Sequence, residues 1–267
     1  MESTEKALVL KVGRFREVDV WVRLFSARKG IFSAFAFGGS VSRRRFLGCL
    51  DPFNLVTFKI RSDTAKGYIY LLEGSLIAAH PRLRRDAERL GMAVNCLKFL
   101  EAAHLGPSGS EAAYDLTLKT LSVLDRSDSP TPVLPLFFRA RMAFDQGFRP
   151  EFSSCARCGA NLCGNKACSP PDPDLTGAMA PGPLPARLLV EQGKLLCGDC
   201  RQWARGPAVL LSRESLTVLR ALCSQAPERW ADIEMSAQAR VECGRALEQF
   251  VEHHLGLTWD HGSFRRI

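Results

Sequence analysis

Four cysteines, arranged as two Cys-x-x-Cys pairs, are the residues of this chain best suited to chemistry. Cys155 and Cys158 form the first pair, and Cys197 and Cys200 form the second. Each pair can present two thiolates to one ion, so the four together could complete a tetrahedral zinc site. Four thiolate ligands leave no open position for a substrate. We therefore expect one Zn²⁺ ion with a structural role.

Two further cysteines leave the ligand set open. Cys163 and Cys168 follow the first pair closely, so these two and the first pair could also chelate an ion locally. We favour the two Cys-x-x-Cys pairs, because only they tie together the ends of the Pro- and Gly-rich loop at residues 170–185. The alternative interpretation is that the four cysteines are unliganded thiols or a redox pair.

An arginine triplet at residues 43–45 is the second candidate site. Three adjacent arginines cannot be buried together, because each would need its own anion, so we expect a solvent-facing loop. Residues 1–80 carry thirteen Lys and Arg against seven Asp and Glu, whereas residues 151–203 carry five of each. The excess indicates a polyanionic partner for the first eighty residues. The candidate DNA-binding residues are Arg14, Arg16, Arg28, Lys29, Arg43, Arg44, Arg45, Lys59 and Arg61.

Aromatic residues lie among these cations. Phe15, Trp21, Phe46 and Phe53 could stack on bases, although such rings more often belong to the core. No catalytic residue is expected. None of the five histidines is followed two residues later by Glu, as a zinc deaminase would require, and there is no phosphate-binding GxxxxGK[ST] motif.

The elements that must position these residues change character near residue 80. Residues 6–75 contain five short runs with strand-like patterns, clearest at 20–25 and 31–37, which predicts a small β-barrel of the OB-fold or SH3-like type. Helical patterns occur at residues 111–124, 133–148, 212–224 and 237–255, and in a first helix from Pro81 with an apolar stripe through Leu83, Leu90 and Val94. We expect an α+β protein with an OB-fold domain at 1–80 and an all-α domain at 81–267, interrupted by a zinc module at 151–203.

The remaining features indicate a cytoplasmic protein. No run approaches the roughly twenty apolar residues that cross a bilayer. The first residues are polar and acidic, unlike a signal peptide, and ten cysteines without such a signal are typical of the cytosol.

With these residues in view, the chain resembles the bacterial recombination mediator family RecO over nearly its whole length. The resemblance depends on the order and spacing of several short segments rather than on one motif. These segments are residues 5–10, 24–30, 42–46, 50–53, 148–152, 155–159, 196–200 and 250–257. The long Pro-rich insertion between the cysteine pairs departs from the family pattern.

The resemblance implies an OB-fold, a helical domain with a zinc module, and a non-enzymatic role in DNA repair and recombination. It implies binding of single- and double-stranded DNA, annealing of complementary strands, and help in loading RecA filaments onto DNA coated by single-strand-binding protein (SSB). The implied partners are RecR and the acidic C-terminal tail of SSB. A zinc-ribbon transcription regulator, with its DNA contact at the cysteine pairs, is the alternative, but the neutral charge of residues 151–203 argues against it.

An acidic, hydrophobic tail needs an apolar groove with a positive rim. The first helix offers this combination, because apolar Leu83, Leu90 and Val94 alternate with basic residues. The expected rim residues are Arg82, Arg84, Arg85 and Arg89. The alternative is that these arginines only solvate a helix whose leucines belong to the core.

Overall fold

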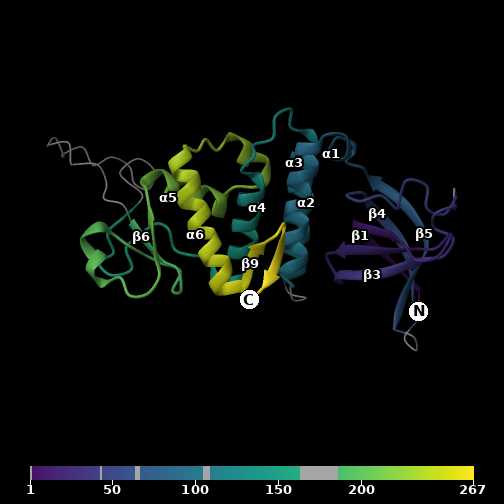
Figure 1. The fold of residues 1–267 in the computed structure, drawn as a ribbon, viewed down its shortest axis with the longest axis horizontal. Coiled ribbons are helices and arrows are strands. Elements are labelled where there is room, and N and C mark those ends of the chain that lie inside the picture. Colours follow the sequence, from purple (N-terminus) through teal and green to yellow (C-terminus); the bar gives the residue numbers. More distant parts are fainter. Residues whose placement is uncertain (1, 43, 64–66, 105–108, 163–185) are drawn as a thin grey trace. The chain divides into compact units, whose positions relative to one another are not determined.

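The structure, a computed structural model of the 267-residue chain, describes residues 2–42, 44–63, 67–104, 109–162 and 186–267. Its contacts divide the chain into two compact units, residues 1–132 and 133–267. The first unit combines a five-stranded barrel with three helices (Figure 1). The second unit combines helices with a three-stranded sheet and a terminal hairpin.

The barrel has the strand order of an OB-fold. Its strands are β1 (Glu2–Arg14), β2 (Val20–Ser26), β3 (Gly30–Ala36), β4 (Leu55–Asp63) and β5 (Tyr68–Ala78). They pair in the order β1-β2-β3-β5-β4, and β4 also pairs with β1, which completes the barrel. Only the β3–β5 pair is parallel. This Greek-key arrangement confirms the predicted OB-fold and distinguishes it from an SH3-like barrel.

Strand alternation places small side chains inside the barrel and large rings outside it along β3. Ala34 and Ala36 are fully buried in the barrel core, whereas Phe35 is only partly buried and Phe37 is exposed. Successive side chains of a strand point to opposite faces, so the two phenylalanines share the outer face. A strand with alanines inside and phenylalanines outside is unusual, because core positions normally take the larger apolar residues.

Three helices complete the first unit: α1 (Pro81–Arg85), α2 (Ala87–Ala102) and α3 (Ser110–Arg126). Helix α3 packs on β2 and β3, where its Tyr114 ring meets Phe25 edge-on at a centroid distance of 5.4 Å. The sequence predicted α3 and one continuous helix from Pro81, but the structure has two helices there, α1 and α2, because the backbone of Asp86 between them is extended. The predicted apolar stripe was wrong in its first part. Leu90 is exposed, while Arg89, expected off the stripe, is only 5% exposed.

Arg89 is buried because it joins two helix ends. Its Nη1 donates to the carbonyl oxygens of Leu124 (2.5 Å) and Ser127 (2.7 Å), and its Nη2 donates to that of Asp128 (2.8 Å). Its Nε lies 3.1 Å from a carboxylate oxygen of Asp86, which also caps the N-terminus of α2. The cation thus satisfies carbonyls at the C-terminal end of α3, where a positive charge is favoured.

The second unit is built on α4 (Leu134–Ala143), α5 (Arg213–Ser224) and α6 (Ala237–Leu255). Shorter helices η2 (Phe144–Phe148), η3 (Gly198–Trp203) and η4 (Pro227–Asp232) connect them. The core rings include Phe144, which meets Phe250 edge-on at 5.3 Å. The predicted helices at 133–148, 212–224 and 237–255 are therefore confirmed. On α6, Val241 is exposed.

Five short strands of the second unit were not predicted. Strands β6 (Ala186–Leu189), β7 (Lys194–Leu196) and β8 (Ala208–Leu211) form an antiparallel sheet in the order β7-β6-β8. Strands β9 (Leu257–Asp260) and β10 (Ser263–Arg266) form a C-terminal hairpin. Each has only three or four residues, too few for a period of two to be recognised. Among the described residues, no helix is both long and apolar enough to cross a membrane.

Candidate metal centre and nucleic-acid interface

The four cysteines of the two Cys-x-x-Cys pairs come together in the second unit. The Sγ atoms of Cys155, Cys158, Cys197 and Cys200 all lie within 4.8 Å of one another. The closest approach described is 3.7 Å, between Cys158 and Cys197. Tetrahedral zinc with Zn–S bonds of about 2.3 Å places its sulfur ligands about 3.8 Å apart. The arrangement therefore fits a metal ion held by four thiolates.

Strand β7 brings the two pairs together across the sequence. In the first pair, the Ala156 N–H donates to the Leu195 carbonyl of β7 at 2.8 Å. The second pair begins at Cys197, immediately after β7 ends. Gly159 adopts a left-handed φ of +72° and donates to the Cys155 carbonyl, which closes the first turn. One strand thus fixes both turns at the same site.

The surroundings of the sulfurs favour ionisation unequally. Burial opposes charge on Cys155, but hydrogen bonds from the backbone of Cys158, Cys197 and Arg157 outweigh it and lower the pKa of its thiol to about 6. Burial, with the neighbouring thiols, raises the pKa of Cys200 to about 12. A bound cation would be needed to hold all four as thiolates at neutral pH.

Within the described residues, no other group of three or more His, Cys, Asp or Glu side chains is close enough to hold a metal ion. Leu189 and Leu196 pack with Cys155, Cys197 and Cys200 in a small core of their own. Cys163 and Cys168, the alternative ligands, lie outside the described residues.

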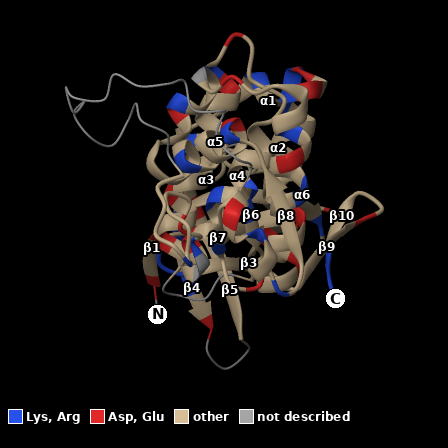
Figure 2. Ribbon diagram, turned by 90° about the vertical axis from the view of Figure 1, so that its left-hand side faces the viewer, with Lys and Arg blue, Asp and Glu red and all other residues tan. Residues whose placement is uncertain are grey.

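The candidate DNA-binding residues lie on different strands and turns of the barrel and do not form a single patch. Figure 2 shows Lys and Arg distributed over many elements of the chain. Arg14 and Arg16 lie at one end of β1 and β2, and the loop that carries Arg44 and Arg45 packs beside the same turn. The contacts are the Gly38 N–H to the Asp19 carboxylate (2.8 Å) and the Ser40 N–H to the Val18 carbonyl (3.1 Å). All four arginines are exposed, as predicted. Arg43 lies outside the described residues.

The other candidates lie elsewhere on the barrel. Arg28 and Lys29 occupy the opposite end of β2, about 20 Å away for a seven-residue strand. Lys59 is exposed but its Nζ lies 3.4 Å from the Glu2 carboxylate, so its charge is partly neutralised. Arg61 is exposed and lies between Glu2 and Tyr70 in the neighbouring strands.

An aromatic surface covers the outside of β2, β3 and β5. Cross-strand pairing aligns Trp21 with Phe35, and Phe35 with Tyr70. Ring contacts extend the row: centroids lie 5.3 Å apart for Phe15 and Phe35, 5.5 Å for Phe35 and Tyr68, and 5.3 Å for Phe37 and Tyr70. Phe15, Phe37 and Tyr68 are each about half exposed, at 50%, 47% and 51%. We call these six rings the aromatic face: Phe15, Trp21, Phe35, Phe37, Tyr68 and Tyr70.

Cations border the aromatic face. Arg16 lies over the Phe15 ring at 5.3 Å and Lys11 over the Trp21 ring at 5.8 Å. Arg45 donates from Nη2 to the Phe37 carbonyl at 2.6 Å. Gly13 allows the Trp21 indole to lie against β1, since a Cβ there would meet the ring at 2.4 Å. Rings and cations therefore alternate across one side of the barrel.

The sequence identified only part of this surface. Of the four rings predicted as stacking candidates, Phe15 is exposed and Trp21 is partly exposed, whereas Phe46 and Phe53 are core residues at 4% and 3% exposure. Phe35, Phe37, Tyr68 and Tyr70 were missed. The signal that could have identified them is the alternation along β3, which places alanines on one face of the strand and phenylalanines on the other.

The predicted tail-binding rim is largely engaged within the first unit. Arg84 donates to the Pro52 carbonyl (2.9 Å) and Asn54 Oδ1 (3.0 Å), and Arg82 pairs with the exposed Asp128 at 3.4 Å. Arg89 is buried, so its assignment to the rim is wrong. Arg85 is exposed, and its side chain forms no ion pair or hydrogen bond with the described residues.

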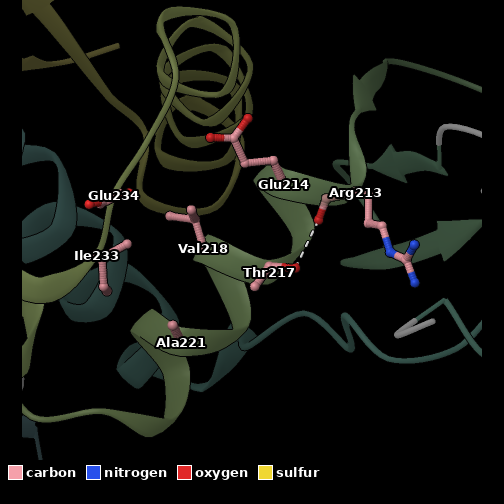
Figure 3. A pocket seen from close by; sticks show the side chains of 7 residues that line it. All are labelled: Arg213, Glu214, Thr217, Val218, Ala221, Ile233 and Glu234. Carbon is pink, nitrogen blue, oxygen red and sulfur yellow. Dashed lines mark hydrogen bonds between the residues drawn. The ribbon is translucent and has the colours of Figure 1, made fainter. Parts of the chain in front are cut away.

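A cavity of about 600 Å³ lies along α5 in the second unit (Figure 3). Val218, Ala221 and Ile233 form its apolar side, and its rim carries Glu214 and Glu234. The Glu214 carboxylate accepts hydrogen bonds from the Ser236 N–H (2.7 Å) and Oγ (2.6 Å), which lower its pKa. Among the described residues that line the cavity, Arg213 is the one cation. This rim is unsuited to an acidic peptide.

Comparison with known proteins agrees with this architecture. The family model described as recombination protein O N terminal matches residues 1–80, and that described as recombination protein O C terminal matches residues 84–262. The DNA repair protein RecO of Nitratidesulfovibrio vulgaris (strain Hildenborough) is 46% identical over 267 residues, which is 100% of both chains. RecO of Solidesulfovibrio magneticus is 45% identical over the same span, with 100% of both chains covered. RecO of Anaeromyxobacter dehalogenans is 29% identical over 250 residues, 93% of this chain and 90% of that protein.

The predicted resemblance is thus confirmed over the whole chain, and both family models fall on the segments in which the barrel and the cysteine cluster were found. We conclude that this chain belongs to the RecO family of DNA repair proteins.

Proposed function

We propose that this protein is a non-enzymatic recombination mediator that binds single- and double-stranded DNA, anneals complementary strands and helps to load RecA on DNA coated by SSB. The aromatic face of the barrel is the observation that carries this proposal. OB-folds bind oligonucleotides on the face of strands 2 and 3 and on adjoining loops, which is where these rings lie. Membership in the RecO family supports the same role.

The physical mechanism is stacking combined with charge neutralisation. Exposed rings accept bases of any sequence, because every base has a π-face, while neighbouring arginines neutralise phosphates. Repulsion between phosphates opposes the approach of two strands, so a protein that neutralises both would promote their annealing. This mechanism requires no catalytic residue.

We further propose that Cys155, Cys158, Cys197 and Cys200 hold one Zn²⁺ ion with a structural role. Four close thiols fit the softness and tetrahedral geometry of zinc better than those of magnesium or calcium. The ion would hold the two turns together at the end of β7. On this proposal residues 151–203 form a zinc module inserted in a helical domain at 81–267. In the sequence, this domain follows a DNA-binding domain at 1–80.

The proposed role of the aromatic face is tested by the double variant Phe37→Ala/Tyr68→Ala. Removing two exposed rings should weaken binding to a labelled oligo(dT) by about tenfold or more, because each base–ring stack contributes roughly 1–3 kcal/mol. The slope of log affinity against log salt should not change. Fluorescence anisotropy at several salt concentrations measures both quantities. Val41→Ala, which shortens an exposed apolar side chain, is the control. Unchanged affinity in the double variant would refute the proposed surface.

Loss of the arginine triplet, unlike loss of the rings, should change the salt dependence of DNA binding. Replacing Arg43, Arg44 and Arg45 together by alanine should flatten the salt dependence by about two units, since each phosphate contact contributes roughly 0.7–0.9. Lys59→Ala is the matched control, because the charge of Lys59 is already offset by Glu2 and its loss should change the slope much less. A slope that the triple replacement leaves intact would mean that the loop faces a partner other than DNA.

The proposed protein partners are RecR and the C-terminal tail of SSB. For the tail we retain the exposed arginines of α1, with Arg85 as the main contact and Arg82 and Arg84 as neighbours. Arg85→Glu should weaken binding of a labelled tail peptide several-fold, since an exposed ion pair contributes roughly 0.2–1 kcal/mol and reversal adds repulsion. Binding of naked oligonucleotide serves as the control and should change little. An unaltered peptide affinity would place the tail elsewhere.

A further inference from the structure

Beside the cysteine cluster, an arginine stacks on an exposed tryptophan. A metal site made of four thiolates does not require this stack. Arg157 lies between the two cysteines of the first pair, and Trp203 ends η3, three residues after Cys200. The guanidinium carbon of Arg157 is 3.6 Å from the centroid of the Trp203 ring. The tryptophan nevertheless remains 48% exposed, so a large part of the ring faces solvent.

Further cations surround this ring. Arg201 and Arg205 lie two residues before and after Trp203, and both are exposed, as is Arg157. No carboxylate of the described residues forms an ion pair with any of the three. Asp199 is the nearest acid in the sequence, and residues 151–162 and 186–205 contain five basic and three acidic residues. The five basic and five acidic residues of 151–203 include Lys166, Asp172 and Asp174, which lie outside the described residues.

This combination favours single-stranded nucleic acid over an acidic peptide. A guanidinium on one face of an indole leaves the other face open for a base, and arginines on either side can neutralise successive phosphates. An acidic, hydrophobic peptide would need a cavity for its apolar side chain. Trp203 and Arg157 line neither the cavity along α5 nor the one of about 550 Å³ beside α6.

We propose that Trp203, with Arg157, Arg201 and Arg205, forms a second contact for single-stranded DNA, separate from the aromatic face of the barrel. A base stacks on the free face of Trp203, and the arginines neutralise the flanking phosphates. The inference rests on the proposed DNA-binding function and extends it, because annealing needs two strands to be held at once.

The test uses the full-length, zinc-loaded protein and a labelled oligo(dT). Trp203→Ala should weaken binding at least about fivefold in a variant that already lacks Phe37 and Tyr68, so that the barrel contributes little. Arg201→Gln/Arg205→Gln should flatten the salt dependence by about 1.4 units. The control is Trp259→Ala, which removes a tryptophan of similar exposure (45%) from the C-terminal hairpin and should leave affinity unchanged.

A direct readout comes from tryptophan emission. With Trp21→Phe and Trp259→Phe, the emitting residues are Trp203 and the fully buried Trp230, so oligo(dT) should quench the exposed component. Absence of quenching overturns the proposal, as does quenching by an acidic peptide alone. If Trp203 had only a structural role, Trp203→Ala would lose zinc and Trp203→Phe would retain it. The two variants would then bind oligo(dT) equally, and this result would contradict the proposal. The barrel variants report on the proposed function independently, so its failure can be told from failure of this contact.

Discussion

Replacing Cys155 and Cys158 together by serine should abolish zinc binding and unfold the turns that the ion holds together. The metal contributes directly to folding in such sites: apparent binding free energies of structural zinc in small peptides are about 10–16 kcal/mol at neutral pH. Burial raises the pKa values of Cys197 and Cys200, so without the zinc ion these two thiols would stay protonated. Protonated thiols would not bind zinc on their own. Elemental analysis and thermal unfolding of purified protein measure both losses. We expect Cys155→Ser alone to have the same effect in weaker form.

Cys163→Ser is the matched control for this experiment. It removes a thiol that follows the first pair by only five residues, yet it should retain the full zinc content if the two Cys-x-x-Cys pairs form the site. Full zinc retention in the double variant at 155 and 158 would refute the assignment. Lost zinc in Cys163→Ser would instead favour the local ligand set.

The second large effect is expected at Arg89. Arg89→Met keeps much of the side-chain volume but leaves the carbonyls of Leu124, Ser127 and Asp128 without their donor. Removing one partner of a buried charge network typically costs roughly 3–5 kcal/mol, a large part of the stability of a domain. Urea unfolding followed by circular dichroism should show the midpoint shift to lower denaturant concentration.

Arg85→Met provides the comparison. Arg85 ends α1, four residues before Arg89, and it is exposed, so its loss should change the free energy of unfolding by less than about 0.5 kcal/mol. Equal stability of the two variants would contradict the role assigned to Arg89. The result also matters for partner binding. A reversal of Arg89 would lower peptide affinity through unfolding alone, so only Arg85 can report on the tail.

Several strands and helices could be predicted because the spacing of apolar residues along a segment indicates its secondary structure. The strands at 20–26 and 30–36 and the helices at 213–224 and 237–255 follow directly from periods of two and of about 3.6. The cluster of four cysteines was predicted as well, because the Cys-x-x-Cys spacing places two sulfurs on one turn whatever surrounds them. Exposure of Arg44 and Arg45 followed from the cost of burying adjacent like charges.

Other features depend on contacts between residues that are distant in the sequence. Arg89 was assigned to the surface because arginine is usually exposed, but carbonyls from the end of α3, about 35 residues later, make its burial favourable. The aromatic face arises because strand order places β3 between β2 and β5, so rings from three separate segments meet.

By itself the sequence determined the family, the barrel followed by helices, the four thiols and the basic character of the first eighty residues, since these depend on composition and local spacing. Tertiary structure alone decided which rings face solvent, which cations are already neutralised by acids, and that the short strand β7 joins two cysteine pairs 38 residues apart. The physical reason is that burial and pairing are set by neighbours in space, which a one-dimensional pattern does not contain.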